Sequence, residues 1–170
     1  MSNDIMFLWH LKGENRFKGV TLLELMVAVA IISVLLSLGF ISFKRLKANY
    51  DLTEATNRLY SDIEWLRQKS MGSAHPYGIS FSANSYSLFQ DADGEKDFDA
   101  GEEIEKENLK NIELKKGKRS DPPVPITTPI DVIYSRRGTP NLNSLTITLE
   151  NKYKNAREVR ISKFKTRIFQ

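Results

Sequence analysis

The chain has 170 residues, of which 41% are hydrophobic and 27% charged, a balance that excludes a polytopic membrane protein and a wholly disordered chain. It has no cysteine and two histidines, His10 and His75, so disulfides and thiolate sites are excluded and a histidine-based site has few residues to use. The net charge of +4 is uneven, because residues 91–107 hold nine acidic residues against two lysines, whereas 108–170 hold fourteen basic residues against five acidic ones. This composition argues against an ordinary enzyme and for separate charged surfaces.

The first element expected is an apolar helix over residues 20–43. This segment contains one charge, Glu24, and is long enough to span the hydrocarbon core of a membrane. A polar stretch of 19 residues comes before it and no small-residue cleavage site follows it, which is unlike a secretory signal peptide. An ordinary signal anchor would look similar but for Glu24. A carboxylate inside an apolar segment calls for a partner, unless Glu24 is simply tolerated near the membrane interface.

Residues 18–25, KGVTLLEL, resemble the class III signal of type IV pilins and type II secretion pseudopilins. The resemblance implies that a prepilin peptidase cleaves between Gly19 and Val20 on the cytoplasmic side and that Val20 is then N-methylated. It also places Glu24 at the fifth mature position, where the family has a glutamate. In a filament this carboxylate would meet the N-terminal ammonium of a neighbouring subunit, so that neither charge is left alone in an apolar core. The family more often has Phe or Met where Val20 stands, and the leader here is longer and more acidic than in many members.

The helix is expected to continue over residues 44–72. Apolar residues recur here at spacings of two to four with charged residues mostly between them, which is the pattern of an amphipathic helix. This part should therefore pack on a globular domain, and Trp65 is expected in that core rather than in a subunit contact. The apolar positions are Leu46, Tyr50, Leu52, Ala55, Leu59, Ile63 and Leu66.

From residue 76 onward the hydrophobic period becomes that of strands. Residues 77–81 and 86–89 should form a hairpin, followed by shorter apolar pieces near Ile104 and at 112–114. Residues 115–129 contain four prolines and should form a loop or an edge crossing. The further strands expected are 130–134, 144–149, 158–161 and 165–169. The fold class predicted is α+β, with a long helix, membrane-spanning in its first half, packed through its second half on antiparallel β-sheet.

The C-terminal part is similar to the H-type pseudopilins and FimT-type minor pilins. A helix ending near residue 69 is followed by a strand that runs into DADG at 91–94, then by RGTP at 137–140, another strand and a basic hairpin. The resemblance implies a pilin-like fold with a cleaved leader (1–19), a membrane and filament-core helix (20–43), its amphipathic continuation (44–72) and a periplasmic β-rich domain (73–170). It also implies a single-pass protein of the bacterial inner membrane that is extracted into a filament of other pilins or pseudopilins, near the tip.

The acidic residues of the loop after residue 90 alternate in a way that indicates a calcium site. The alternating residues are Asp91, Asp93, Glu95, Asp97, Asp99 and Glu102. Of these, Asp91, Asp93, Asp97 and Asp99 would be the ligands. An EF-hand loop has a glycine at its sixth position, whereas Lys96 stands there in this chain, and the flanking pattern is that of strands. A solvated acidic turn is therefore the favoured interpretation, with calcium as the alternative and no other cofactor expected.

The C-terminal end is rich in basic residues, with seven in residues 152–167. If Phe164, Thr166 and Ile168 point inward, Lys163, Lys165 and Arg167 share the outward face and, with Arg160, could hold the phosphates of DNA. FimT-type minor pilins bind DNA through a C-terminal Gly-Arg-Val-Arg turn, and the best match here, TRIF at 166–169, keeps one arginine and lacks the glycine. The alternative is an exposed basic strand face that discourages edge pairing.

The sequence thus predicts a structural subunit of a type IV pilus or a type II secretion pseudopilus, which is a substrate of a prepilin peptidase and not itself an enzyme. A DNA-binding minor pilin that acts in DNA uptake through the basic hairpin is the second function considered. A single-pass periplasmic protein unrelated to filaments is the third, and it would make Gly19 and Glu24 coincidental.

Overall fold

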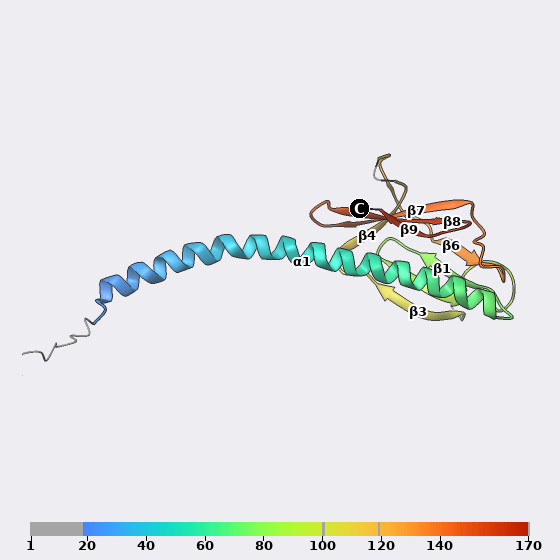
Figure 1. Ribbon diagram of the computed structural model, residues 1–170, viewed down its shortest axis with the longest axis horizontal. Helices are drawn as coiled ribbons and strands as arrows, with labels where there is room; N and C mark the ends of the chain where they lie inside the picture. Colours follow the sequence, from blue (N-terminus) through green and yellow to red (C-terminus); the bar gives the residue numbers. More distant parts are fainter. Residues whose placement is uncertain (1–18, 100, 119, 170) are drawn as a thin grey trace, which may run out of the picture. The chain divides into compact units, whose positions relative to one another are not determined.

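The computed structural model of the protein (Figure 1) describes residues 19–99, 101–118 and 120–169. For residues 38–41 it describes the backbone only. The predicted leader lies outside the described residues except for Gly19. The chain divides into two compact units between Ile41 and Ser42, and the second unit is globular. The elements are α1 (Leu22–Gly72), β1 (Tyr77–Phe81), β2 (Ser85–Gln90), β3 (Glu103–Asn108), β4 (Ile112–Lys116), β5 (Val124–Pro125), β6 (Ile130–Tyr134), β7 (Ser144–Asn151), β8 (Ala156–Ser162) and β9 (Arg167–Phe169).

The strands of the globular unit form two antiparallel sheets (Figure 1). The first has the order β3-β2-β1-β6, and the second has the order β5-β4-β7-β8-β9. In the first sheet, Ile79 of β1 lies opposite Leu88 of β2 on one side and Val132 of β6 on the other. In the second sheet, β7 is central because β4 and β8 pair along it. Alternate side chains of these central strands consequently share one buried face.

The second half of α1 contributes four side chains to the core. Leu52, Leu59, Ile63 and Leu66 are each no more than 2% exposed. Their spacing puts them on one face of a helix. They form one hydrophobic cluster with side chains of β1, β2 and β6 from the first sheet and of β4, β7 and β8 from the second. The predicted α+β architecture, with the helix packed on antiparallel sheet, is confirmed.

Polar contacts fix the first sheet to the helix. The hydroxyl of Tyr86 on β2 donates a hydrogen bond of 2.6 Å to Asp62, and burial, followed by that carboxylate, raises the pKa of Tyr86. Arg58 pairs with Glu105 and Glu107 of β3 at 2.9 and 3.0 Å, and the charge of Glu107 raises the pKa of Arg58. These contacts hold the β2–β3 hairpin beside the helix.

Asparagine amides fix the second sheet to an earlier turn of the helix. The side-chain amide of Asn151, at the end of β7, donates to the carbonyl of Ala48 at 3.3 Å and to Oδ1 of Asn49 at 3.1 Å. The amide of Asn155 donates to the same Asn49 oxygen at 2.7 Å. The β7–β8 turn is therefore held on α1 by a small network of amide hydrogen bonds.

The strand predictions are confirmed with differences at the ends. β1 and β6 have the predicted bounds, and β2, β7 and β8 run one or two residues further. The proline-containing loop includes a short edge strand, β5, which pairs with the end of β4. β9 begins at Arg167 and not at residue 165, because the hydroxyl of Ser162 donates to the carbonyl of Lys165 and accepts from its N–H, which holds a turn there.

Trp65 is not in the core, contrary to the prediction. It is 43% exposed and makes an edge-on ring contact with Tyr77 at 6.2 Å. Its place in the sequence, two residues after Ile63 and one before Leu66, turns it away from the buried helix face.

Gly78, in the middle of β1, lies under an aromatic ring. A Cβ at this position would lie 2.3 Å from the ring of Phe89, its cross-strand partner, which is itself buried and in contact with Phe98. We expect Gly78→Ala to lower the free energy of unfolding by about 1–3 kcal/mol through overpacking. Urea unfolding of a fragment of residues 44–170 measures this.

The matched control is Gly72→Ala at the end of α1, where a Cβ would meet no atom within 4 Å. This variant should change stability by less than about 1 kcal/mol. Equal stability of the two variants would contradict the packing at Gly78.

Candidate functional site

The apolar helix begins at an N-cap. The hydroxyl of Thr21 accepts a hydrogen bond of 3.2 Å from the backbone N–H of Glu24, and the carbonyl of Thr21 accepts one of 3.1 Å from Leu25. These bonds satisfy backbone donors that are otherwise unpaired in a first helical turn. The T-x-x-E spacing is that of a capping box, so this start could have been predicted from the sequence.

The predicted cleavage site lies just before this cap. Gly19 and Val20 are exposed and belong to no helix or strand. A Cβ on Gly19 would meet no atom within 4 Å of the described chain, so its own fold does not require a glycine there. The described chain therefore leaves the backbone between these two residues exposed.

Glu24 is the third residue of α1, and its side chain is exposed. A carboxylate in the first turn interacts favourably with the positive end of the helix dipole. The surrounding apolar side chains of Leu22, Leu23, Leu25 and Met26 are 77%, 74%, 59% and 64% exposed. α1 contains an 18-residue window that is apolar enough to cross a membrane, with none of it buried in the described chain. Such a surface requires lipid or other chains as cover.

The acidic loop brings only some of the predicted calcium ligands together. Two groups of three carboxylates have oxygens within 4.8 Å of one another: Asp91, Asp93 and Glu102, and Asp93, Glu95 and Asp99. Within the described residues Asp97 belongs to neither group, so the four predicted ligands do not form one cluster. Glu102 belongs to the alternating acidic residues of the sequence, and the pairing of strands fixes its place: its carbonyl accepts a hydrogen bond from the N–H of Gln90.

The two arginines of the basic hairpin differ in their surroundings. Arg160 of β8 and Arg167 of β9 lie directly opposite each other. Arg160 is half-buried, and its guanidinium carbon lies 4.5 Å from the centre of the Phe169 ring. Arg167 is exposed. Arg160 therefore packs within the hairpin, whereas Arg167 is available to a ligand.

The turn of this hairpin presents an aromatic ring between two lysines. Phe164 is 80% exposed, so the prediction that it points inward is wrong, whereas Thr166 is buried as predicted. Lys163 and Lys165 are exposed, and the Lys163 ammonium lies 6.0 Å from the centre of the Phe164 ring. Because the turn starts immediately after β8, Phe164 does not follow the alternation of a strand.

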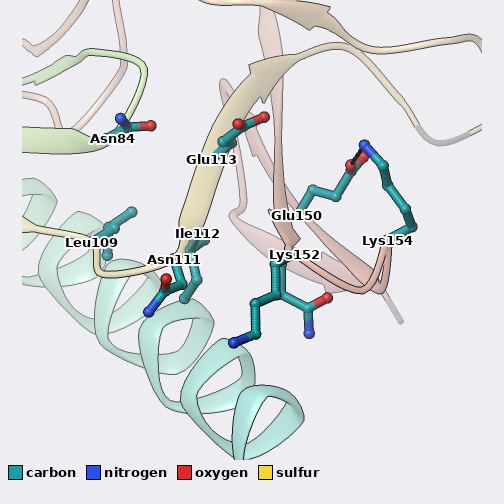
Figure 2. Close-up of a pocket in the computed structure, with 9 residues that line it drawn as sticks. Asn84, Leu109, Asn111, Ile112, Glu113, Glu150, Lys152 and Lys154 are labelled. Atoms are coloured by element: carbon teal, nitrogen blue, oxygen red, sulfur yellow. Dashed lines mark hydrogen bonds and ion pairs between the residues drawn. The ribbon is translucent and has the colours of Figure 1, made fainter. Parts of the chain in front are cut away.

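A polar hollow lies beside the turns that precede β4 and follow β7, and Figure 2 shows the residues that line it. Glu150 accepts a hydrogen bond of 2.9 Å from Lys154 and pairs with Lys115 at 3.1 Å, and these bonds lower the pKa of Glu150. A carboxylate held as the anion by two lysines is poorly suited to exchange a proton near neutral pH. The most enclosed carboxylate of the hollow therefore serves the structure.

Comparison with known families decides what these features belong to. Residues 15–40 match the prokaryotic N-terminal methylation motif, and residues 55–163 match the type II transport protein GspH. The chain belongs to the GspH family. No curated protein and no solved structure matched it.

This GspH-family protein is thus a pilin-like protein with the role of a pseudopilin or minor pilin, which is a structural kind of protein. Its methylation motif implies processing by a prepilin peptidase and assembly with other pilins, and its apolar helix is that of a membrane-anchored pilin. The motif match includes Gly19, Val20 and Glu24. The GspH match ends at residue 163, so β9 with Arg167 lies beyond it.

The different surroundings of the two arginines lead to a prediction. Arg160→Ala should lower the free energy of unfolding by about 1 kcal/mol, because it removes the contact with the Phe169 ring and the packing of the arginine stem. Arg167→Ala, at the exposed position opposite, should change it by less than about 0.5 kcal/mol. Urea unfolding of the 44–170 fragment measures both, and equal effects would rule out a packing role specific to Arg160.

Proposed function

We propose that this GspH-family protein is a low-abundance structural subunit of a type II secretion pseudopilus or a type IV pilus, incorporated near the filament tip. It is made as a precursor, cleaved between Gly19 and Val20 and N-methylated on Val20. It is a substrate of the prepilin peptidase and not itself an enzyme. The observation that carries this proposal is the match of residues 15–40 to the methylation motif, supported by the exposed, non-helical bond at Gly19.

The proposal assigns a role to each part of the chain. Residues 20–43 hold the precursor in the bacterial inner membrane as a single span, and the fully exposed apolar window of α1 supports this role. Because the leader is cleaved on the cytoplasmic side, a single span puts residues 73–170 in the periplasm, with 44–72 joining the two. Extraction of the helix into the filament then exchanges lipid for other pilin helices as cover.

The assembly contact involves the charges at the start of the helix. Cleavage creates an ammonium on Val20, and Val20 lies before the N-cap, outside the hydrogen bonds of α1. In the filament this ammonium meets the carboxylate of Glu24 from a neighbouring subunit. Each charge alone is costly in an apolar surrounding, and their pairing offsets that cost.

Processing and assembly can be tested separately. In cells with the peptidase, the intact mass should correspond to residues 20–170 with one added methyl group. Gly19→Val should accumulate as folded precursor, because a side chain has room at this position. A wild-type protein that retains residues 1–19 would refute the cleavage site.

Glu24→Ala should be cleaved normally but enter filaments more than tenfold less, because an unpaired buried charge costs about 3–5 kcal/mol and about 1.4 kcal/mol already corresponds to tenfold. The control is Glu54→Ala, which removes an exposed glutamate of the same helix outside the apolar segment. The ratio of filament to membrane protein measures both. Normal incorporation of Glu24→Ala would exclude the charge pair.

A second candidate function is DNA binding during DNA uptake. The observation that favours it is the hairpin turn with the start of β9, where Lys163, Lys165, Arg167 and the ring of Phe164 are all exposed. Cations bind the phosphates and an aromatic ring can stack on a base, which together hold single-stranded nucleic acid without sequence preference.

Retention of DNA by the 44–170 fragment at low and physiological salt tests this function. A variant with Lys163, Lys165 and Arg167 all changed to Ala should lose salt-sensitive binding, while Arg160 is kept because it packs on Phe169. The charge-matched control changes three exposed lysines elsewhere, Lys69, Lys106 and Lys110. No binding at low salt, or equal loss in the control, would exclude a DNA receptor at the hairpin.

A further inference from the structure

The loop between β2 and β3 is anchored at its base and in its middle. At the base, the N–H of Gln90 donates to the carbonyl of Glu102 at 3.2 Å, and the N–H of Asp91 donates to the carbonyl of Pro76 at 3.1 Å. In the middle, the ring of Phe98 packs on Phe89 of β2, with ring centres 5.2 Å apart. The acidic side chains of the loop are therefore carried on a fixed frame.

Three carboxylates meet at the base of this frame. Oxygens of Asp91, Asp93 and Glu102 lie within 4.8 Å of one another, although Asp91 is only 1% exposed. One oxygen of Asp91 accepts a hydrogen bond from Gly94 N–H, and one oxygen of Glu102 accepts one from Ala92 N–H, both at 2.7 Å. The second oxygens, Oδ2 of Asp91 and Oε2 of Glu102, are buried, and no donor of the described residues reaches them.

This arrangement is unfavourable unless something binds to it. A buried carboxylate oxygen without a partner loses its hydration and gains nothing in return, and neighbouring carboxylates repel one another. Within the part of the chain that the structure describes, no lysine or arginine forms an ion pair with Asp91, Asp93 or Glu102. A cation from outside the described chain would supply the positive charge that these carboxylates lack.

We propose that Asp91, Asp93 and Glu102 bind a calcium ion at the base of the β2–β3 loop. Calcium is bound by oxygen ligands at about 2.3–2.6 Å, so oxygens on opposite sides of one ion are about 5 Å apart, which accommodates the 4.8 Å cluster. Asp91 Oδ2 and Glu102 Oε2 are the buried ligands, and Asp93 is the exposed one. The remaining positions of the ion are filled by water or by oxygens of the loop.

The donor set selects among ions. Zinc prefers nitrogen and sulfur ligands, and this loop contains neither histidine nor cysteine. Magnesium requires near-ideal octahedral geometry at about 2.1 Å and keeps most of its water, whereas calcium accepts an irregular set of carboxylates. The second cluster shares Asp93 and adds Glu95 and Asp99, all exposed, so it increases the negative potential around the same place.

The test is titration of the purified full chain in detergent with calcium chloride after treatment with a chelator. Isothermal calorimetry should show one ion per chain, and calcium should raise the melting temperature in a way that the chelator reverses, because a ligand of the folded state stabilises it. Magnesium at the same concentration should have a much smaller effect. A wild-type chain that shows neither heat nor a melting shift with calcium would overturn the proposal.

Matched variants locate the ion. Asp93→Asn and Glu102→Gln should each weaken calcium binding by more than about tenfold. Removal of a group that only hydrogen-bonds to a metal ligand already weakens binding by about this much, and these two variants change the ligands themselves. Asp97→Asn lies in the same loop but in neither described cluster, and it should bind as the wild type does. Because Asp93 is exposed, its variant should fold normally without calcium. Equal loss in Asp97→Asn, or no loss in Asp93→Asn and Glu102→Gln, would overturn the site, and neither result bears on processing or assembly.

Discussion

One face of α1, formed by Leu52, Leu59, Ile63 and Leu66, is buried against both sheets, and the globular unit depends on this contact. The sheets share no strand among the described residues, so their common core joins them, together with a backbone hydrogen bond of 2.7 Å from Leu114 of β4 to Ala83 in the β1–β2 turn. Each fully buried leucine or isoleucine contributes about 1.5–3 kcal/mol. The four together are comparable to the whole stability of a typical domain, which is about 5–15 kcal/mol. The helix is thus as much a part of the globular unit as any strand.

The same helix is built for different surroundings along its length. Near Leu22 and Leu25 its apolar side chains are exposed in the single chain. This is expected for a helix segment that lipid or other helices cover, because the covering molecules are separate from the chain. In the second half only one stripe is apolar, and charged side chains such as Arg58 occupy the flanks. This change can be read from the sequence alone, because the apolar residues go from nearly continuous in the first half of the helix to a helical spacing in the second half.

The sequence was sufficient for most elements that a local pattern determines, although Leu46 and Tyr50, predicted on the packed face of the helix, are 51% and 66% exposed. The end of α1 at Gly72 and the bounds of β1 and β6 follow from periodicity and from the prolines and polar residues beside them. The N-terminal motif at Gly19 and Glu24 is equally local, and the family match covers it.

The errors arose where long-range contacts decide. Trp65 and Phe164 are exposed because a helix turn and a hairpin turn, respectively, point them outward, which their hydrophobicity did not reveal. Asp97 has the right spacing for a ligand but does not join either described cluster. Glu102, which the alternating pattern includes, joins one because β3 returns beside β2. Arg160 is basic like its neighbours, yet its ring partner is supplied by the adjacent strand.

The network around Asn49 has a mechanical consequence. The Arg45–Tyr153 contact and the amide bonds of Ala48 and Asn49 to the β7–β8 turn precede the buried face of α1, so a tension applied along the helix from its N-terminal side loads them before the core. These bonds lie ahead of Leu52, the first fully buried side chain of the helix. Amide hydrogen bonds at a partly exposed site can break and re-form with water as a substitute, whereas apolar side chains pulled from a core leave a cavity. We therefore expect the hydrogen bonds of this turn to break and re-form under tension before the buried side chains of the core separate.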